Sequence, residues 1–255
     1  MSNVFITTSA FGSEVVLKKG QGFYFPIIAK AGVKGVEVRK ELFSEKDISL
    51  TGLRKLIEGK KLISVYSVPL TIWKHNGELN EESIRLAVNE AMELGAKLVK
   101  FSLGEFNSTI SSINKLKKIL IELDIEKHDL QITVENDQTK WGGSVKNLNE
   151  FLEECLSKGV SIGMTFDIGN WNWSGVDAYD AAITLAKYVV YIHCKHVEFK
   201  FNQWVTLPLP RENNSKWRDI LSVLPLDVPR AIEFPIRGEN LEQVTNEYVQ
   251  LLANV

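Results

Sequence analysis

Short runs of β-branched and other apolar residues recur along the chain, and stretches with apolar residues at three- and four-residue spacing lie between them. The first pattern is typical of strands buried on both faces, and the second of amphipathic helices. The predicted strands are Val4–Thr8, Gly35–Arg39, Leu62–Val68, Lys97–Leu103, Gln131–Glu135, Gly163–Asp167, Val189–His193 and Arg230–Phe234. Strands that alternate with helices in this way predict an α/β fold with a parallel sheet.

Four of the intervening segments are clear helix candidates. They are Ser83–Leu94, Ile113–Leu123, Leu148–Lys158 and Asn240–Ala253. Asn80 precedes the first of them as a cap candidate and Gly95 follows its end, as is common at helix boundaries.

Eight βα units in 255 residues match a single (β/α)8 TIM barrel, which we expect to occupy residues 1–255 as one domain. An open, doubly wound sheet is the structural alternative. It usually carries a glycine-rich phosphate-binding turn after the first strand, whereas the segment after Thr8 reads SAFGSEVVLKKGQG. The barrel is therefore the prediction, with its active site at the C-terminal ends of the strands.

Composition places the chain among ordinary globular enzymes, with 44% hydrophobic and 24% charged residues and a formal net charge of −2. No block of like charge indicates a nucleic-acid or membrane partner. The two cysteines, Cys155 and Cys194, are not spaced as a zinc or redox pair. No segment approaches the roughly 18 apolar residues of a membrane span, and no basic-then-apolar leader begins the chain. We therefore expect a cytoplasmic protein with reduced thiols.

Ionisable residues gather at the ends of the last four predicted barrel strands. Each of these strands delivers one candidate metal ligand: Glu135, Asp167, His193 and Glu233. Any one of them alone is more often a helix cap or a loop residue, and His193 alone could be a buried, hydrogen-bonded imidazole. Four successive strands that end in the same way favour a metal site instead. Three carboxylates and one imidazole suit Mn²⁺, Mg²⁺ or Co²⁺ better than Zn²⁺.

The segments TVEND, TFDIGNW, YIHCKH and RAIEFP, which contain these residues, resemble the xylose-isomerase-like TIM barrel superfamily. GVEVRKELF and ELGAKLVKFSLG are similar to it as well, so the resemblance covers nearly the whole chain. The superfamily includes sugar isomerases, ketose 3-epimerases, hydroxypyruvate isomerases, inosose dehydratases and type IV endonucleases.

By this resemblance the four residues hold one Mn²⁺-like ion, and Glu135 and Glu233 are also the catalytic acid–base pair. The implied reaction is isomerisation or epimerisation of a sugar, a sugar phosphate or a small polyhydroxy ketone by proton transfer through a metal-stabilised enediolate. Two positions depart from the family pattern: Asn170 stands where many relatives have a histidine, and His196 where they often have an aspartate. Both departures bear on the substrate more than on the metal.

The residues expected to contact the substrate are polar or aromatic residues near the predicted strand ends: Glu37, His75, Lys100, Asn170, Trp171, Lys195, His196 and Arg237. Some have plain structural alternatives. Trp171 could instead pack in the protein, and His75 could be an ordinary loop residue.

Three other functions compete. A metal-dependent dehydratase of a polyol or keto acid would use the same residues, and the sequence does not separate it from an isomerase. A catalytically silent sugar-binding barrel would show a broken ligand set, whereas here the set is complete. An endonuclease would need several more histidines than the four present and a basic face, so we expect no nucleic-acid partner. Relatives are often dimers or tetramers, so a homo-oligomer is an open expectation.

Overall fold

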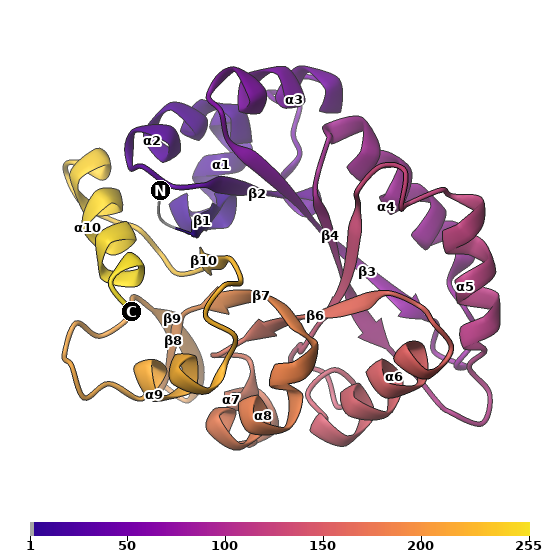
Figure 1. The fold of residues 1–255 in the computed structure, drawn as a ribbon. Coiled ribbons are helices and arrows are strands. Elements are labelled where there is room, and N and C mark those ends of the chain that lie inside the picture. The colour runs from indigo at the N-terminus through magenta and orange to yellow at the C-terminus, as the bar shows by residue number, and fades with distance from the viewer. Residues whose placement is uncertain (1–2) are drawn as a thin grey trace.

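A closed ring of parallel strands forms the centre of the molecule, and helices surround it (Figure 1). The computed structural model describes residues 3–255. Around the ring the strand order is β1-β10-β7-β6-β5-β4-β3-β2, and every neighbouring pair is parallel. The predicted (β/α)8 barrel is confirmed.

The barrel strands fall where the apolar runs predict them. They are β1 (Val4–Thr7), β2 (Gly35–Arg39), β3 (Ile63–Trp73), β4 (Leu98–Gly104), β5 (Gln131–Glu135), β6 (Ile162–Asp167), β7 (Val189–Cys194) and β10 (Arg230–Ile232). The largest difference is β3, which continues five residues beyond its predicted end at Val68 after a shift of register between Ser67 and Thr71.

The helices are α1 (Ser13–Lys19), α2 (Phe25–Lys30), α3 (Leu50–Gly59), α4 (Glu81–Leu94), α5 (Ile113–Glu122), α6 (Val145–Ser157), α7 (Trp171–Ser174), α8 (Ala178–Leu185), α9 (Lys216–Val223) and α10 (Leu241–Ala253). Gly95 ends α4 in the left-handed conformation, as predicted. Asn80 occupies the N-cap position of α4, but its side chain makes no capping hydrogen bond.

An antiparallel hairpin of β8 (His196–Lys200) and β9 (Gln203–Leu207) follows β7. It lies beside α9 at the lower left of Figure 1. Its turn residues, Phe201 and Asn202, both have positive φ, which matches the twist of a tight hairpin. The hairpin extends from the same strand end that carries His193.

Two apolar regions are separated by the barrel wall. The larger one lies between the strands and the helices, where Val36 and Val38 of β2 point. The smaller one, which we call the apolar floor, consists of Phe5, Val65, Leu98, Tyr191 and Ala231.

The apolar floor lies inside the barrel. Phe5 of β1 and Tyr191 of β7 pack edge to face with ring centroids 5.8 Å apart, although β10 separates their strands in the ring. A side chain at Gly35 would collide with the Phe5 ring at 2.1 Å, so the large ring requires a glycine on the next strand. The floor closes the N-terminal half of the barrel, as filled layers of side chains do in this fold.

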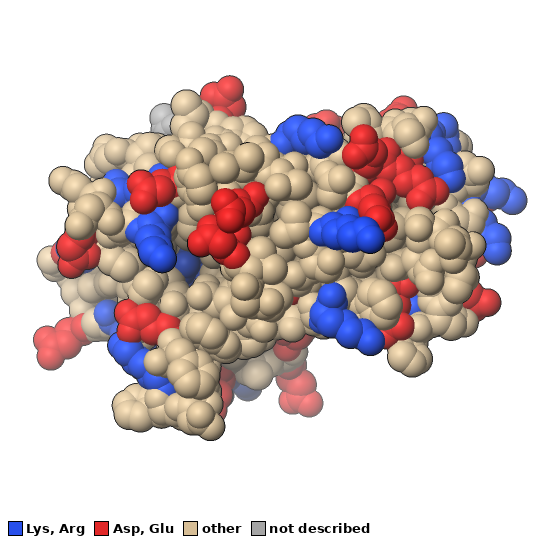
Figure 2. Space-filling view, turned by 90° about the horizontal axis from the view of Figure 1, so that it is seen from below, with Lys and Arg blue, Asp and Glu red and all other residues tan. Residues whose placement is uncertain are grey.

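Charged groups of both signs are interspersed on the face shown in Figure 2, and much of that face is uncharged. Among residues 3–255, no helix is long and apolar enough to cross a membrane.

Candidate metal centre

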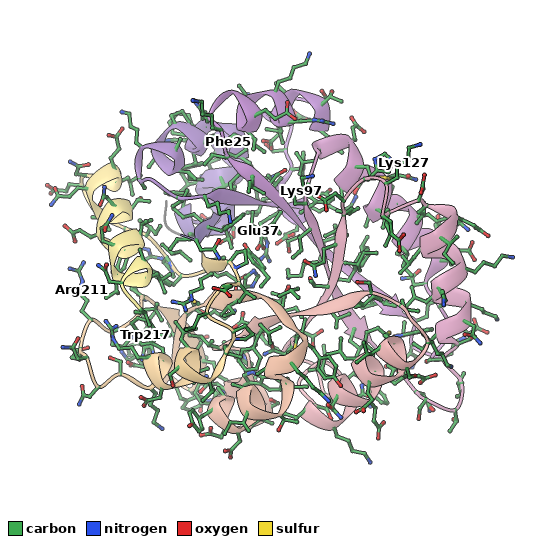
Figure 3. The ribbon with its side chains drawn as sticks, viewed as in Figure 1. Phe25, Glu37, Lys97, Lys127, Arg211 and Trp217 are labelled. Carbon is green, nitrogen blue, oxygen red and sulfur yellow. The ribbon has the colours of Figure 1, made fainter. Side chains whose placement is uncertain are left out.

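The C-terminal half of the barrel interior is lined with ionisable side chains, in contrast to the floor beneath it. Successive strand residues point to opposite sides of a sheet, so Glu37 and Arg39 point inward where Val36 and Val38 point outward. The same alternation, continued one residue beyond β7 and β10, brings seven side chains together. We call them the charged layer: Glu37, Lys100, Glu135, Asp167, His193, Lys195 and Glu233. Figure 3 labels Glu37, which lies within the ring of strands, whereas Lys127 and Arg211 lie on the periphery.

The four residues predicted as metal ligands converge within this layer. One ligand atom from each of Glu135, Asp167, His193 and Glu233 lies within 4.8 Å of the others. Asp167 and His193 are completely buried, whereas the side chains of Glu135 and Glu233 retain 9% and 13% exposure. Only these two glutamates among the four can therefore meet a molecule that enters from the mouth of the barrel.

His193 is held between carboxylates on both sides of its ring. Nδ1 lies 2.6 Å from Glu135 Oε1, and Nε2 lies 2.7 Å from Glu37 Oε2. Burial alone would lower the pKa of this imidazole, but the charges of Glu233, Glu37 and Glu135 raise it well above its usual value. Without a metal, His193 is therefore an imidazolium that donates a hydrogen bond from each nitrogen.

Lysine and arginine side chains pair with the same carboxylates. Lys100 donates a short hydrogen bond to Glu135. Lys195 Nζ lies 2.6 Å from Asp167 Oδ2 and 2.9 Å from Glu233 Oε2, and Arg39 Nη1 lies 2.8 Å from Glu233 Oε1. These three cations offset much of the negative charge of the carboxylates.

The carboxylates differ in how well their charge is compensated. Burial raises the pKa of Glu135, but Lys100 and His193 outweigh it and hold the pKa at about 2. Asp167 behaves in the opposite way, since burial and the nearby Glu233 and Glu135 raise its pKa to about 7 against the attraction of Lys195. Asp167 is thus the least compensated acid in the layer, and an additional cation would stabilise its charged form.

The loop after β6 is built to hold Asp167 in place. Asp167 Oδ1 accepts hydrogen bonds from the backbone N–H groups of Gly169, at 2.7 Å, and Asn170, at 2.9 Å. A Cβ at Gly169 would lie 2.6 Å from Lys195 Cγ, so the glycine leaves room for the lysine stem to reach Asp167. These contacts direct the other carboxylate oxygen, Oδ2, toward the centre.

The donor set fits a divalent cation. Three carboxylates and one imidazole nitrogen converge on one point, they are buried or nearly so, and they come from four adjacent strands of a rigid barrel. The backbone bonds that orient Asp167 and the Glu37 bond that orients His193 are the outer contacts such sites use.

Of the residues expected to contact substrate, Lys100 and Lys195 lie in the charged layer and pair with the candidate ligands. Glu37 is there as well, but it is completely buried behind His193. It contacts a candidate ligand and has no surface for a substrate.

Two other expected contacts, Trp171 and Asn170, have structural roles. Trp171 is fully buried, with its ring 5.6 Å from that of Phe166, so it packs in the protein. Asn170 Nδ2 donates to the carbonyl of Asn136, and Asn170 Oδ1 accepts a bond from Gln138, so its amide braces the loops after β5 and β6.

The remaining candidates lie away from the centre. The side chain of His75 is 96% exposed and pairs with Glu105. His196 pairs with Glu198 within the hairpin strand β8, and Arg237 is exposed after β10. Arg39 is a further basic residue that the sequence places near the mouth, at the inward end of β2 and two residues after Glu37. It contacts the centre directly through Glu233 and also pairs with Glu41.

Comparisons with known proteins agree with this fold. The family model "Xylose isomerase-like TIM barrel" matches residues 25–228, so the chain belongs to that family. The comparison with curated proteins gave no match.

Solved structures match over nearly the whole chain at low identity. D-psicose 3-epimerase from Clostridium cellulolyticum H10 has a TM-score of 0.68 at 11% identity, covering 100% of this chain and 99% of that one. The IOLI protein, solved with a bound zinc atom, has a TM-score of 0.68 at 14% identity, covering 100% and 96%. The probable 3-DHS dehydratase AsbF from Bacillus anthracis has a TM-score of 0.66 at 15% identity, covering 99% and 98%. At such identities these likenesses show the shared fold.

Proposed function

We propose that this single-domain chain is a divalent-metal-dependent isomerase or epimerase that acts on a sugar, a sugar phosphate or a small polyhydroxy ketone. The observation that carries the proposal is the convergence of Glu135, Asp167, His193 and Glu233 on one point, with only the two glutamates open to the barrel mouth. The ion would be held by these four residues, with Mn²⁺ our first candidate and Mg²⁺, Co²⁺ and Zn²⁺ the alternatives. A bound divalent cation would polarise adjacent carbonyl and hydroxyl oxygens of the substrate and so make the proton on the neighbouring carbon more acidic.

The chain's own residues would move that proton. Glu135 comes from β5 and Glu233 follows β10, so the two carboxylates approach the centre from different parts of the ring. One carboxylate oxygen would remove the proton from carbon, and the other carboxylate would return one. The neighbouring cations hold the pKa of both groups low, which keeps them ionised as bases before substrate arrives.

Lys100 and Lys195 would orient the substrate. In the described structure each is paired with a carboxylate of the centre. If those carboxylates held a divalent ion instead, the two ammonium groups would be available to hydroxyl, carboxylate or phosphate oxygens of a bound molecule.

The test is metal-dependent exchange of a carbon-bound proton. Protein loaded with Mn²⁺ is incubated in D₂O with a panel of ketoses and ketose phosphates, and mass spectrometry follows deuterium uptake. We expect uptake with at least one substrate, its loss on chelation, and its loss in Glu135→Gln but not in Glu105→Gln, which changes a carboxylate at the rim. Turnover that is insensitive to both chelation and Glu135→Gln would refute the proposal.

Dehydration is the second candidate, because a protein described as a dehydratase shares the fold over almost its full length. Elimination of a β-hydroxyl would follow the same proton removal. The assay separates the two reactions, because a dehydrated product is lighter than its substrate by one water.

A further inference from the structure

Glu37 is the one acid of the charged layer that is not itself a candidate metal ligand. It points inward from the middle of β2, between its backbone partners Thr7 of β1 and Val65 of β3. Its side chain is completely buried, and both of its oxygens have partners. Oε2 lies 2.7 Å from His193 Nε2, and Oε1 lies 3.2 Å from Arg39 Nη1.

The bond to His193 settles which ring nitrogen faces the centre. Nε2–H donates to Glu37, and Nδ1 points the other way, toward the three carboxylates. Nδ1 lies 2.6 Å from Glu135 Oε1, 3.3 Å from Glu233 Oε2 and 3.9 Å from Asp167 Oδ2. A histidine that keeps its proton on Nε2 offers the lone pair of Nδ1 to a metal, so Glu37 selects the ligating nitrogen.

The bond to Arg39 extends this control to a second ligand. Arg39 Nη1 contacts Glu37 Oε1 and also lies 2.8 Å from Glu233 Oε1. With Oε1 of Glu233 held by the guanidinium, its other oxygen, Oε2, is the one that faces His193 and Lys195. One buried carboxylate therefore orients His193 directly and Glu233 through a single arginine.

We propose that Glu37 is a positioning residue of the metal centre, which fixes the Nε2–H form of His193 and, through Arg39, the rotamer of Glu233. This inference rests on the proposed function, since it assumes that His193 and Glu233 bind an ion. Under this proposal Glu37 contributes to metal affinity, rather than contacting the substrate as the sequence suggested.

The first experiment is a Mn²⁺ titration followed by electron paramagnetic resonance of the free ion. Glu37→Gln keeps the size of the side chain but leaves one acceptor oxygen for two donors, His193 Nε2–H and Arg39. We expect its Mn²⁺ dissociation constant to rise by about 10- to 100-fold, the range typical of lost outer contacts.

The matched control is Glu41→Gln. Glu41 also accepts a hydrogen bond from Arg39, at 2.7 Å from Nε, but it lies at the rim and makes no contact with His193. Its Mn²⁺ affinity should match that of the unmodified protein. Equal affinities in all three proteins would overturn the inference alone, whereas no Mn²⁺ binding by the unmodified protein would overturn the proposed function along with it.

Two further measurements keep the inference testable if Glu37→Gln fails to fold. Glu37→Asp keeps the charge but is one methylene too short to reach His193, so a folded Glu37→Asp protein should lose Mn²⁺ affinity as Glu37→Gln does. In the unmodified protein loaded with Zn²⁺, nitrogen-15 spectra of the histidines should show His193 protonated on Nε2 and not on Nδ1. A proton on Nδ1 would overturn the inference without any variant.

Discussion

The two halves of the barrel interior are built by the same strands but differ in chemistry. The apolar floor contains Phe5, Val65, Leu98, Tyr191 and Ala231, all of them buried hydrophobic residues. The charged layer above it carries four carboxylates, two lysines and a histidine, nearly all of them buried as well. Only one step of two residues along β7 separates Tyr191 from His193, whose rings are 5.3 Å apart.

The difference shows that the apolar floor and the charged layer have different roles. Burying apolar groups favours folding, whereas burying charges costs free energy unless each charge finds a partner. The floor therefore contributes stability, and the charged layer holds a site that the floor keeps rigid. Substitutions in the two halves should therefore have separable effects. Those in the charged layer should lower metal affinity and turnover, and those in the apolar floor should lower the free energy of unfolding.

The largest effect is expected in the charged layer. Glu135→Gln removes a metal ligand, a proton acceptor and the partner of Lys100. We expect turnover on the substrate identified by deuterium exchange to fall by roughly 10²- to 10⁴-fold, as for loss of a general base, with steady-state kinetics as the measurement. Near-normal turnover would remove Glu135 from the mechanism.

In the floor, Leu98→Ala removes a nearly buried side chain from the interior of the barrel. We expect the free energy of unfolding to fall by about 2–5 kcal/mol because a cavity remains. Denaturant titration measures the loss, and metal analysis of the folded variant should find an unchanged metal content. A Leu98→Ala protein that folds but binds no metal would show that the two halves are not separable.

A smaller, pH-dependent effect is expected for Asp167→Asn in chelated protein. The pKa of Asp167 is raised from 3.8 to about 7, so as the pH rises through this window the unfolded chain loses its proton while the folded protein retains it. The Asp167 carboxyl therefore lowers stability progressively up to about pH 7, and asparagine removes that loss.

The gain in free energy of unfolding that Asp167→Asn gives over the unmodified protein should thus be larger at about pH 8 than at about pH 5. The amide oxygen can still accept the bonds from Gly169 and Asn170, so the loop itself is preserved. An equal difference at the two pH values would show that Asp167 is ionised throughout.

The smallest effect is expected for His196→Ala. His196 lies on the hairpin strand β8, one residue beyond Lys195, and its ring pairs with Glu198 at 2.8 Å. Titration should find unchanged Mn²⁺ affinity, because this exposed pair contributes at most about 1 kcal/mol and touches no ligand. Loss of metal in His196→Ala, with retention in His193→Ala, would mean that the wrong histidine of this segment was assigned.

Much of the barrel is predictable because the spacing of apolar residues along the sequence differs between strands and helices. Two predicted strands, Gly35–Arg39 and Gln131–Glu135, have the same bounds in the structure. The hairpin after β7 is not among the predicted strands, although residues 196–207 carry strand-forming residues on both sides of a Phe-Asn turn.

The site is predictable in part. Residues at the ends of parallel strands must converge, so the four candidate ligands follow from strand position alone. Their pairing with Lys100, Lys195 and Arg39 depends on side-chain rotamers and on contacts across the ring. The bond between Arg39 and Glu233, which are 194 residues apart, is one that spacing along the chain does not indicate.

The burial of Glu37 and Trp171 has a similar cause. Strand position places Glu37 inside the barrel, but only the three-dimensional arrangement shows that His193 covers it. Trp171 follows β6 closely enough to suggest the mouth, yet its ring packs against Phe166 in the apolar region between the strands and the helices.

Metal content is the measurement that tests the central claim most directly. The unmodified protein and the Glu135→Gln/Glu233→Gln double variant would be stripped by chelation, dialysed against a mixture of Mn²⁺, Mg²⁺, Co²⁺ and Zn²⁺, and analysed by mass spectrometry. We expect about one ion per chain in the unmodified protein, with Mn²⁺ or Co²⁺ favoured, and almost none in the double variant. No metal in either protein, or equal metal in both, would contradict a metal centre formed by these residues.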